Sequence, residues 1–300
     1  MTRDYEDRDA EAAAELIAVN TPWLQTAAGL RHRLAALPAR AQRATWVADK
    51  DGELIGYAEA EFDWVAEAPD IGNVWAIVHP AHRNRGLGGA LLERATAHVV
   101  ERAASEIRTW SFSDDEFLER RGFAPTRVER LSAVDPRTVD TSRLDALPPE
   151  VTIVPLRALE HRRREVYALF MEALADMPAD HPETNLDYEE WLAETIGDPD
   201  LSHDGSAILL AEDVPAALSW MKVDEQRAVA EQELTGTARA YRRRGLARLA
   251  KLAVLRWCAQ NGITRITTGN DSTNVGMLAI NDELGFRPFA TETQWLRRLR

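Results

Sequence analysis

The sequence is poor in cysteine, in lysine and in net positive charge. Its one cysteine, Cys258, excludes a disulfide within the chain and any metal site built from several thiolates, so we expect a reducing cytoplasm. Lysine supplies only three of the 36 basic residues, and this bias, together with frequent alanine, suggests a bacterial genome rich in GC. The formal net charge is −13, and both halves are acidic, with 17 basic and 24 acidic residues up to Asp140 and 19 and 25 after it. We therefore expect neither nucleic acid nor an anionic membrane as a partner, whereas a cationic substrate fits.

Long hydrophobic runs are also missing. The apolar stretches end well before the length that a membrane span needs, and the acidic start lacks the basic and apolar parts of a secretory leader. We expect a cytoplasmic protein. At 300 residues the chain is long for one domain and suits two domains of roughly 150 residues.

One arrangement of residues occurs twice. The stretch HPAHRNRGLGGALLERA begins at residue 79 and RAYRRRGLARLAKLAVL at residue 239, so that Gly86 and Gly245 lie 159 residues apart. A Gly-Phe pair follows each stretch, in ERRGFAP and in NDELGFRP, with the similar separation of 163 residues. We therefore predict a duplicated domain, with a first copy at 1–138, a linker rich in Pro, Asp, Ser and Thr at 139–150, and a second copy at 151–300.

Both copies are predicted to be mixed α/β domains with their elements in one order. Alternating and helical spacings of apolar residues, with Asp51-Gly52 as a hairpin turn, predict these elements. The first copy has helices at 9–19 and 26–36, strands at 43–49, 53–62 and 73–80, a helix at 86–103, a strand at 106–112, a helix at 114–123 and a strand near 128–134. The second has a strand at 151–156, helices at 161–177 and 187–196, strands at 206–212, 216–223 and 228–237, a helix at 245–262, a strand at 263–269, a helix at 274–286 and a strand at 293–300.

The repeated arginine-glycine turn has the chemistry of an anion site. A strand that ends in a turn opening a helix leaves backbone N–H groups free at the positive end of the helix dipole. Gly86 and Gly88, or Gly245 and Ala247, let a phosphate approach the backbone closely. A Walker loop would continue with Gly-Lys-Ser/Thr, and neither turn does. The hairpin before the turn argues against a dinucleotide-binding fold. A solvated basic turn before an ordinary helix remains the alternative.

The stretch VHPAHRNRGLGGALL resembles the acyl-CoA-binding signature of the GNAT N-acetyltransferase superfamily, Arg/Gln-x-x-Gly-x-Gly/Ala. TGTARAYRRRGLARLAKL is similar, and TTGNDSTNVGMLAINDELGF looks like the Asn-rich segment that follows this signature. The resemblance covers most of both halves, and tandem members of the superfamily include mycothiol synthase-like proteins. It implies two GNAT-like domains that form a pseudo-dimer, each with a mixed sheet whose fourth and fifth strands splay apart around coenzyme A.

The resemblance also implies a cofactor, a reaction and a set of site residues. Acetyl-CoA would supply the acetyl group, a primary amine would attack directly, and a backbone N–H near Val78 or Thr237 would polarise the thioester carbonyl. Asn270 and Asn274 match positions that face cofactor or substrate, although Asn274 or Ser272 could instead cap a helix. The implied cofactor-binding residues are Thr235, Gly236, Thr237, Arg242, Arg243, Arg244, Gly245, Leu246, Ala247, Asn270 and Asn274 in the second half, and Ile77, Val78, Arg83, Asn84, Arg85, Gly86, Leu87 and Gly88 in the first.

The sequence departs from the family pattern at the proton donor. Family members often carry a tyrosine before the closing Leu-Gly-Phe, but Asn281 stands there in the second half and Leu118 in the first. For the general base we expect Glu233, on a strand where Glu231, Glu233, Thr235 and Thr237 would alternate onto one face. Glu233 and Asn281 are the candidate catalytic residues, and we expect no metal.

The first copy has no Asn-rich segment, so we expect the second copy to be catalytic and the first to bind coenzyme A poorly or to serve as scaffold. His181, in the loop between the first two helices of the second copy, is a candidate for contact with an amine. The predicted function is acetyl-CoA-dependent N-acetylation of a small primary amine by a monomer or weak homodimer. Two alternatives remain, which are acetylation of a protein or peptide and acyl-CoA binding without turnover.

Overall fold

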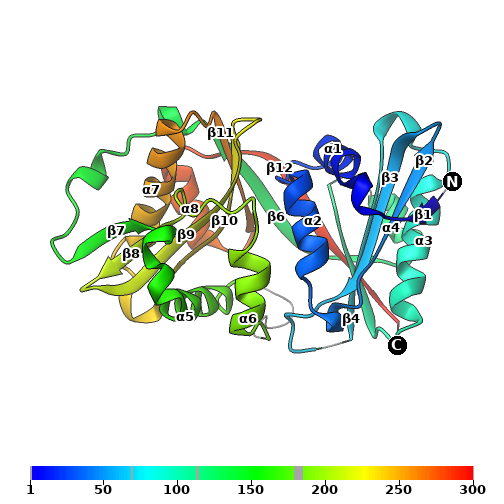
Figure 1. Cartoon of the computed structure of the whole chain (residues 1–300), viewed down its shortest axis with the longest axis horizontal. Helices are drawn as coiled ribbons and strands as arrows, with labels where there is room; N and C mark the ends of the chain where they lie inside the picture. The colour runs from blue at the N-terminus through cyan, green and yellow to red at the C-terminus, as the bar shows by residue number, and fades with distance from the viewer. Residues whose placement is uncertain (1, 69, 113–114, 179–184, 300) are drawn as a thin grey trace. The chain divides into compact units, whose positions relative to one another are not determined.

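The computed structural model describes residues 2–68, 70–112, 115–178 and 185–299, and it divides into two compact units. Unit 1 comprises Met1–Val128 and Thr291–Arg300, and unit 2 comprises Glu129–Ala290. Each unit is a mixed sheet with helices packed against it (Figure 1). In the described part of the chain, no helix is long and apolar enough to cross a membrane. The predicted α/β class with a mixed sheet is confirmed.

In unit 1 the strands follow the order β1-β2-β3-β4-β5-β12. Alternate residues of β3 point to opposite faces, because Ala58 packs against α3 whereas Tyr57 packs against α1. The elements are β1 (Thr2–Asp4), α1 (Ala10–Asn20), α2 (Ala27–Ala36), β2 (Ala44–Lys50), β3 (Glu53–Phe62), β4 (Ile71–Val78), α3 (Leu87–Val100), β5 (Glu106–Ser111), α4 (Asp115–Glu119) and β12 (Arg287–Arg298).

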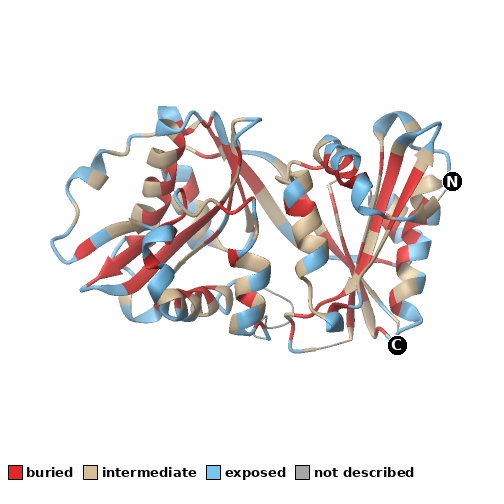
Figure 2. Cartoon of the chain, viewed as in Figure 1, coloured by how far each residue is buried: buried red, intermediate tan, exposed pale blue. Residues whose placement is uncertain are grey.

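In unit 2 the strands follow the order β7-β8-β9-β10-β11-β6, which is the order of unit 1 repeated. The strands β8 and β9 are almost wholly buried (Figure 2), as expected for strands covered by helices on both faces. The elements are β6 (Ala124–Val134), β7 (Val151–Pro155), α5 (Arg163–Leu174), α6 (Tyr188–Trp191), β8 (Ala207–Ala211), β9 (Val214–Asp224), β10 (Val229–Thr237), α7 (Leu246–Gln260), β11 (Arg265–Asp271) and α8 (Val275–Glu283).

The last strand of each unit comes from the other repeat. Thr293–Arg298 of β12 pairs antiparallel with β5 in unit 1, and Glu129–Val134 of β6 pairs antiparallel with β11 in unit 2. Trp295 accordingly lies in the core of unit 1, packed with α3 and β3. The sequence predicted these strands as the ends of their own repeats, and the structure shows an exchange. The functional domains 1–138 and 151–300 stay a prediction. The compact units differ from them by these two strands and by the predicted linker 139–150, which belongs to unit 2.

Most predicted elements are present within a few residues. The hairpin at Asp51-Gly52 is confirmed, and both residues have positive φ (54° and 87°), as a two-residue turn between twisted strands requires. The strand β1 was not predicted. The helix expected from residue 161 begins instead with the 3-10 turns of Leu156–Arg162, and α5 starts at Arg163.

Candidate functional site

The two arginine-glycine turns have the same backbone conformation. Gly245 precedes α7 with φ of 77°, and Gly86 precedes α3 with φ of 85°, a left-handed conformation that favours glycine. Two residues earlier, Arg243 and Asn84 are also left-handed, with φ of 62° and 61°. No side chain caps either helix, and a Cβ on either glycine would have open space around it. Both turns therefore present uncapped backbone N–H groups to an open surface, which is the predicted geometry for an anion.

The first arginine of each turn holds the turn to the rest of its unit. The Nε atoms of Arg83 and Arg242 donate to the carbonyl oxygens of Val78 and Thr237, both at 3.2 Å. The guanidinium of Arg83 also donates to Asn20 Oδ1 at 2.5 Å, and that of Arg242 pairs with the carboxylate of Asp176. In each unit this arginine thus joins the end of the strand before the turn, β4 or β10, to the C-terminal end of the first helix, α1 or α5.

The other predicted arginines of the turns, at 85, 243 and 244, are exposed. Arg85 donates to the carbonyl oxygen of Ala81 at 3.3 Å, and the guanidinium of Arg244 lies over the ring of Tyr241. Their positive charge therefore surrounds the mouth of each turn.

Neighbouring parallel strands diverge beside each turn. In unit 2, only Val229–Glu231 of β10 pair with Arg265–Thr267 of β11. Beyond these residues β10 continues unpaired with β11 to Thr237, and β11 continues to Asp271. In unit 1, β4 and β5 pair only over their first three residues. The predicted splaying of these strands is confirmed in both units.

A β-bulge distinguishes unit 2 from unit 1. The pairing of β10 with β9 shifts between Gln232 and Thr235, so that Glu233 and Leu234 together lie opposite Trp220. The matching strands of unit 1, β3 and β4, keep a regular register, from Gly56 opposite Val78 to Phe62 opposite Gly72. A bulge leaves backbone groups of the extra residue outside the ladder and re-aims the side chains after it.

The bulge corrects the expectation that Glu231, Glu233, Thr235 and Thr237 share one face. Ser219 Oγ accepts from Gln232 Nε2 at 2.6 Å and lies 3.0 Å from Thr235 Oγ1. Gln232 and Thr235 therefore point to the same side although they are three residues apart, which regular alternation does not allow. Thr235 lies on the side away from Glu231.

Glu233 is paired with a lysine. Its Oε1 lies 2.9 Å from Lys222 Nζ, and Lys222 also lies 3.1 Å from Asp198 Oδ2. Burial would lower the pKa of Lys222, but the carboxylates of Glu233 and Asp198 raise it well above its usual value. Lys222 was not identified from the sequence, although its place on β9 directly opposite Glu231 could have suggested a cross-strand pair.

The three asparagines take different places. Asn281, on α8, is fully buried and donates from Nδ2 to Asn270 Oδ1, at the end of β11, over 2.5 Å. The Asn281 Oδ1 atom has no hydrogen-bond partner among the described residues. Asn274 caps α8, accepting from the N–H of Met277 at 3.2 Å, which is the alternative that the sequence left open. The structure thus joins Asn281 to Asn270.

Several other predicted cofactor residues pack against the rest of their unit. Gly236 lies against α5, where a Cβ would come within 2.3 Å of the Cβ of Ala173. Leu246 and Val78 are buried, and Leu87 and Ile77 are partly buried against core clusters. Only the backbone of Leu246 could contact a ligand. Ala247 and Gly88 lie in the first turns of α7 and α3. His181 lies outside the described residues.

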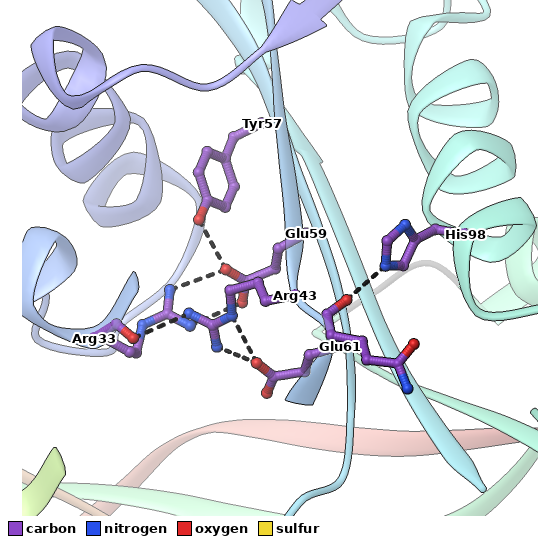
Figure 3. Close-up of polar contacts among 7 residues, drawn as sticks. Arg33, Arg43, Tyr57, Glu59, Glu61 and His98 are labelled. Atoms are coloured by element: carbon purple, nitrogen blue, oxygen red, sulfur yellow. Dashed lines mark hydrogen bonds and ion pairs between the residues drawn. The ribbon is translucent and has the colours of Figure 1, made fainter. Parts of the chain in front are cut away.

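In unit 1, the face of β3 opposite α3 holds a network of paired charges (Figure 3). Arg33 bonds both carboxylate oxygens of Glu59, at 3.0 and 3.1 Å, the hydroxyl of Tyr57 donates to Glu59 at 2.7 Å, and Arg43 Nε donates to Glu61 at 2.7 Å. Burial would raise the pKa of Glu59, but the two guanidinium groups lower it to about 2. Both carboxylates of this network are thus engaged by arginines.

The family follows from comparison with known proteins. The model of the acetyltransferase (GNAT) family matches residues 11–123 and 165–286, one stretch in each repeat. This chain belongs to the GNAT acetyltransferase family. The family uses acetyl-CoA generally, and the chain is accordingly an acetyltransferase with tandem GNAT regions.

Curated relatives of this acetyltransferase share its length. A protein named mycothiol acetyltransferase from Thermobispora bispora is 31% identical over 298 residues, covering 96% of this chain and 93% of the relative. One of the same name from Kineococcus radiotolerans is 32% identical over 260 residues, covering 83% and 80%.

Solved structures share the fold. A tandem GNAT protein from the clavulanic acid biosynthesis pathway superposes with a TM-score of 0.77 at 17% identity, covering 99% of this chain and 98% of the other. A GCN5-related N-acetyltransferase from Sphaerobacter thermophilus gives 0.70 at 18%, covering 100% and 96%. At these identities the likeness establishes the tandem fold alone.

Proposed function

We propose that this acetyltransferase transfers the acetyl group of acetyl-CoA to a primary amine of a small molecule, and that unit 2 carries the reaction. The β-bulge at Glu233–Leu234 carries this assignment, because both units have the open turn and the diverging strands, whereas β4 of unit 1 is regular. The asparagine pair at 270 and 281 lies beside the same diverging strands.

The residues of unit 2 suit the cofactor. The uncapped N–H groups at the start of α7, with Arg243 and Arg244 at the mouth, would hold the pyrophosphate, and the open space at Gly245 leaves room for it. The gap between β10 and β11 would hold the arm that bears the thioester. Acetyl-CoA supplies an acetyl group activated as a thioester.

Backbone and carboxylate groups of β10 would do the remaining chemistry. An N–H of the bulged stretch or near Thr237 would donate to the carbonyl oxygen and stabilise the charge that develops there. Glu233, on the exposed side of the bulge, would take the proton of the attacking ammonium. Lys222 would hold the Glu233 carboxylate in place until the amine arrives.

The acceptor is proposed to be a small amine on two grounds. The relatives that span the chain are named for acetylating mycothiol, a small molecule, and the carboxylates Glu233 and Asp198 lie on one side of β9 and β10 around a single lysine. The two carboxylates exceed the one ammonium by one negative charge, which favours a cationic acceptor.

An assay of thiol release with acetyl-CoA against a panel of small amines tests the proposed function. We expect release that depends on one class of amine. Release stimulated only by peptides or proteins would favour the macromolecular alternative. Binding of acetyl-CoA without release, with either class of acceptor, would favour a protein that binds acyl-CoA without turnover.

Replacing Glu233 by Gln should lower kcat/KM by about 100-fold at neutral pH and flatten the acidic limb of its pH profile, because the amide cannot accept the proton of the amine. Asp198→Asn is the matched control, since it also removes a carboxylate from Lys222 but leaves Glu233. An unchanged pH profile in Glu233→Gln would exclude Glu233 as the base.

A further inference from the structure

Lys251 is a buried lysine that the proposed reaction leaves unused. It lies in α7, one helical turn after Ala247 of the arginine-glycine turn, and its side chain is 1% exposed. Its ammonium lies over the ring of Phe286, 5.2 Å from the ring centre. Among the described residues no carboxylate pairs with it, and burial lowers the pKa of Lys251 to about 7. An unpaired buried amine is costly to the fold and is therefore unusual in a position of pure packing.

The duplication shows that the fold itself does not need this lysine. The separation of 159 residues between the two turns places Leu92 of α3 at the position of Lys251, and Leu118 matches Asn281. Leu92 and Leu118 both belong to the core cluster of unit 1. Two positions that hold buried leucines in unit 1 thus hold a buried lysine and a buried asparagine in unit 2. Both changes occur in the unit that has the bulge.

Two buried amide oxygens of unit 2 lack partners among the described residues. Phe286, under the ammonium, donates its N–H to the carbonyl oxygen of Asn281, which stands at the position of the family tyrosine. Asn281 Oδ1 and Gln232 Oε1 are both buried and have no hydrogen-bond partner in the described ranges. Buried acceptors are normally satisfied, so a donor from a ligand is expected there.

These polar atoms lie where the strands diverge. Thr268 Oγ1 donates to the carbonyl oxygen of Gln232 at 3.0 Å, just after the last paired residues of β10 and β11. Ala230 and Ile266, two residues earlier on the two strands, pack in one cluster with Leu255 of α7. Gln232 and Asn270 therefore point to the side of the sheet that α7 covers. Asn281 and Lys251 come from the helices α8 and α7, which pack on that side.

We propose that Lys251 is the proton donor to the leaving thiolate in unit 2, in the role that a tyrosine has in other members of the family. The proposal rests on the proposed acetyl transfer. As the bond from nitrogen to the acetyl carbon forms, the carbon–sulfur bond breaks and its electron pair remains on sulfur. The Nζ proton of Lys251 moves to that sulfur, and solvent then restores the ammonium.

The charges around Lys251 suit this exchange. On the neighbouring turn of α7, Arg248 is neutralised by Glu283 of α8 at 2.5 Å, and Arg130 of β6 is paired with Asp282 of α8 at 2.8 Å. Glu283 also contacts Arg143 at 3.4 Å, so both carboxylates of α8 are engaged by arginines and do not pair with the lysine. A donor with a pKa about 7 can protonate a thiolate, whose conjugate acid ionises near 8.5 in cysteine.

The chain has only three lysines, so their side chains can be followed individually by NMR of 13C-labelled lysine. We expect one of the three signals to titrate near pH 7 and to be absent in Lys251→Met. Saturation with CoA should change the midpoint of that titration, because the amine and the thiol then exchange a proton, whereas desulfo-CoA should leave it in place. A Lys251 signal that responds equally to CoA and desulfo-CoA would overturn the proposal, since the lysine then senses the ligand but not its sulfur.

Kinetics separate proton donation from packing and from charge. Lys251→Met and Lys251→Arg should both lower kcat by about 100-fold with KM for acetyl-CoA nearly unchanged, because arginine keeps the charge but does not release a proton near neutral pH. Leu92→Met, the same side chain at the matching position of unit 1, should keep the kcat of the wild type. Recovery of activity in Lys251→Arg would contradict proton donation. Absence of amine-dependent release in the wild type would instead contradict the proposed function, and the NMR titration would still test whether Lys251 faces the sulfur.

Discussion

Replacing Gly245 by Glu will weaken acetyl-CoA binding by at least about 100-fold, whereas the same change at Gly86 will leave it nearly unchanged. A carboxylate at Gly245 enters the open space before α7 and repels an anion at the positive end of that helix. The rise in melting temperature that acetyl-CoA gives the wild type should disappear in Gly245→Glu and persist in Gly86→Glu.

Gly262→Glu is the matched control for backbone strain. Gly262 follows the other end of α7, has the same φ of 77° as Gly245, and also has open space at its Cβ. Both substitutions force a side chain into the left-handed region, at a cost of about 1–2 kcal/mol. We expect Gly262→Glu to lower the melting temperature without changing the shift that acetyl-CoA causes. Loss of binding in Gly86→Glu alone would mean that the units have the opposite roles.

Ending the chain at Ala290 will unfold unit 1 and leave the sheet of unit 2 intact. The truncation removes the part of β12 that pairs with β5, together with Trp295, which is 2% exposed in the core of unit 1. Loss of a buried tryptophan alone costs about 3–5 kcal/mol, against a total stability of about 5–15 kcal/mol for a domain. The truncated chain keeps β6, which completes the sheet of unit 2.

Hydrogen exchange measured by mass spectrometry locates the loss. Peptides from β2 to β5 should lose protection, and those from β8 to β11 should keep it. Trp295→Ala should give the same pattern in a full-length chain, and Trp295→Phe, which keeps an aromatic ring in the core, is the control for the substitution itself. Loss of protection in β8 to β11 would contradict the strand exchange and return β12 to its own repeat.

The sequence predicted the turns and the order of elements because both depend on local chemistry. Glycine is needed where φ is positive, at Gly86 and Gly245, and the helices after them show their apolar stripes directly. The strand exchange could not be predicted in this way. The strands β6 and β12 end their repeats at the same place, so either partner satisfies the same pattern.

Two features of the candidate site depend on contacts that one strand or helix does not reveal. The alternation of Glu231, Glu233 and Thr235 predicts a shared face only when the partner strand keeps its register, and the bulge opposite Trp220 breaks it. Lys251 falls in a helix that reads as amphipathic, and its burial follows from α8 and Phe286, which come later in the chain. Its alignment with Leu92 was the signal that could have identified it.

The number of acetyl-CoA molecules bound per chain tests the central claim most directly, because both turns have the geometry of an anion site but only unit 2 has the bulge and the asparagine pair. Calorimetry on the wild-type chain, repeated with Gly245→Glu, gives this number and its location together. We predict one acetyl-CoA per chain in the wild type and none in Gly245→Glu. Two molecules per chain, or one that remains in Gly245→Glu, would contradict the assignment of the working site to unit 2.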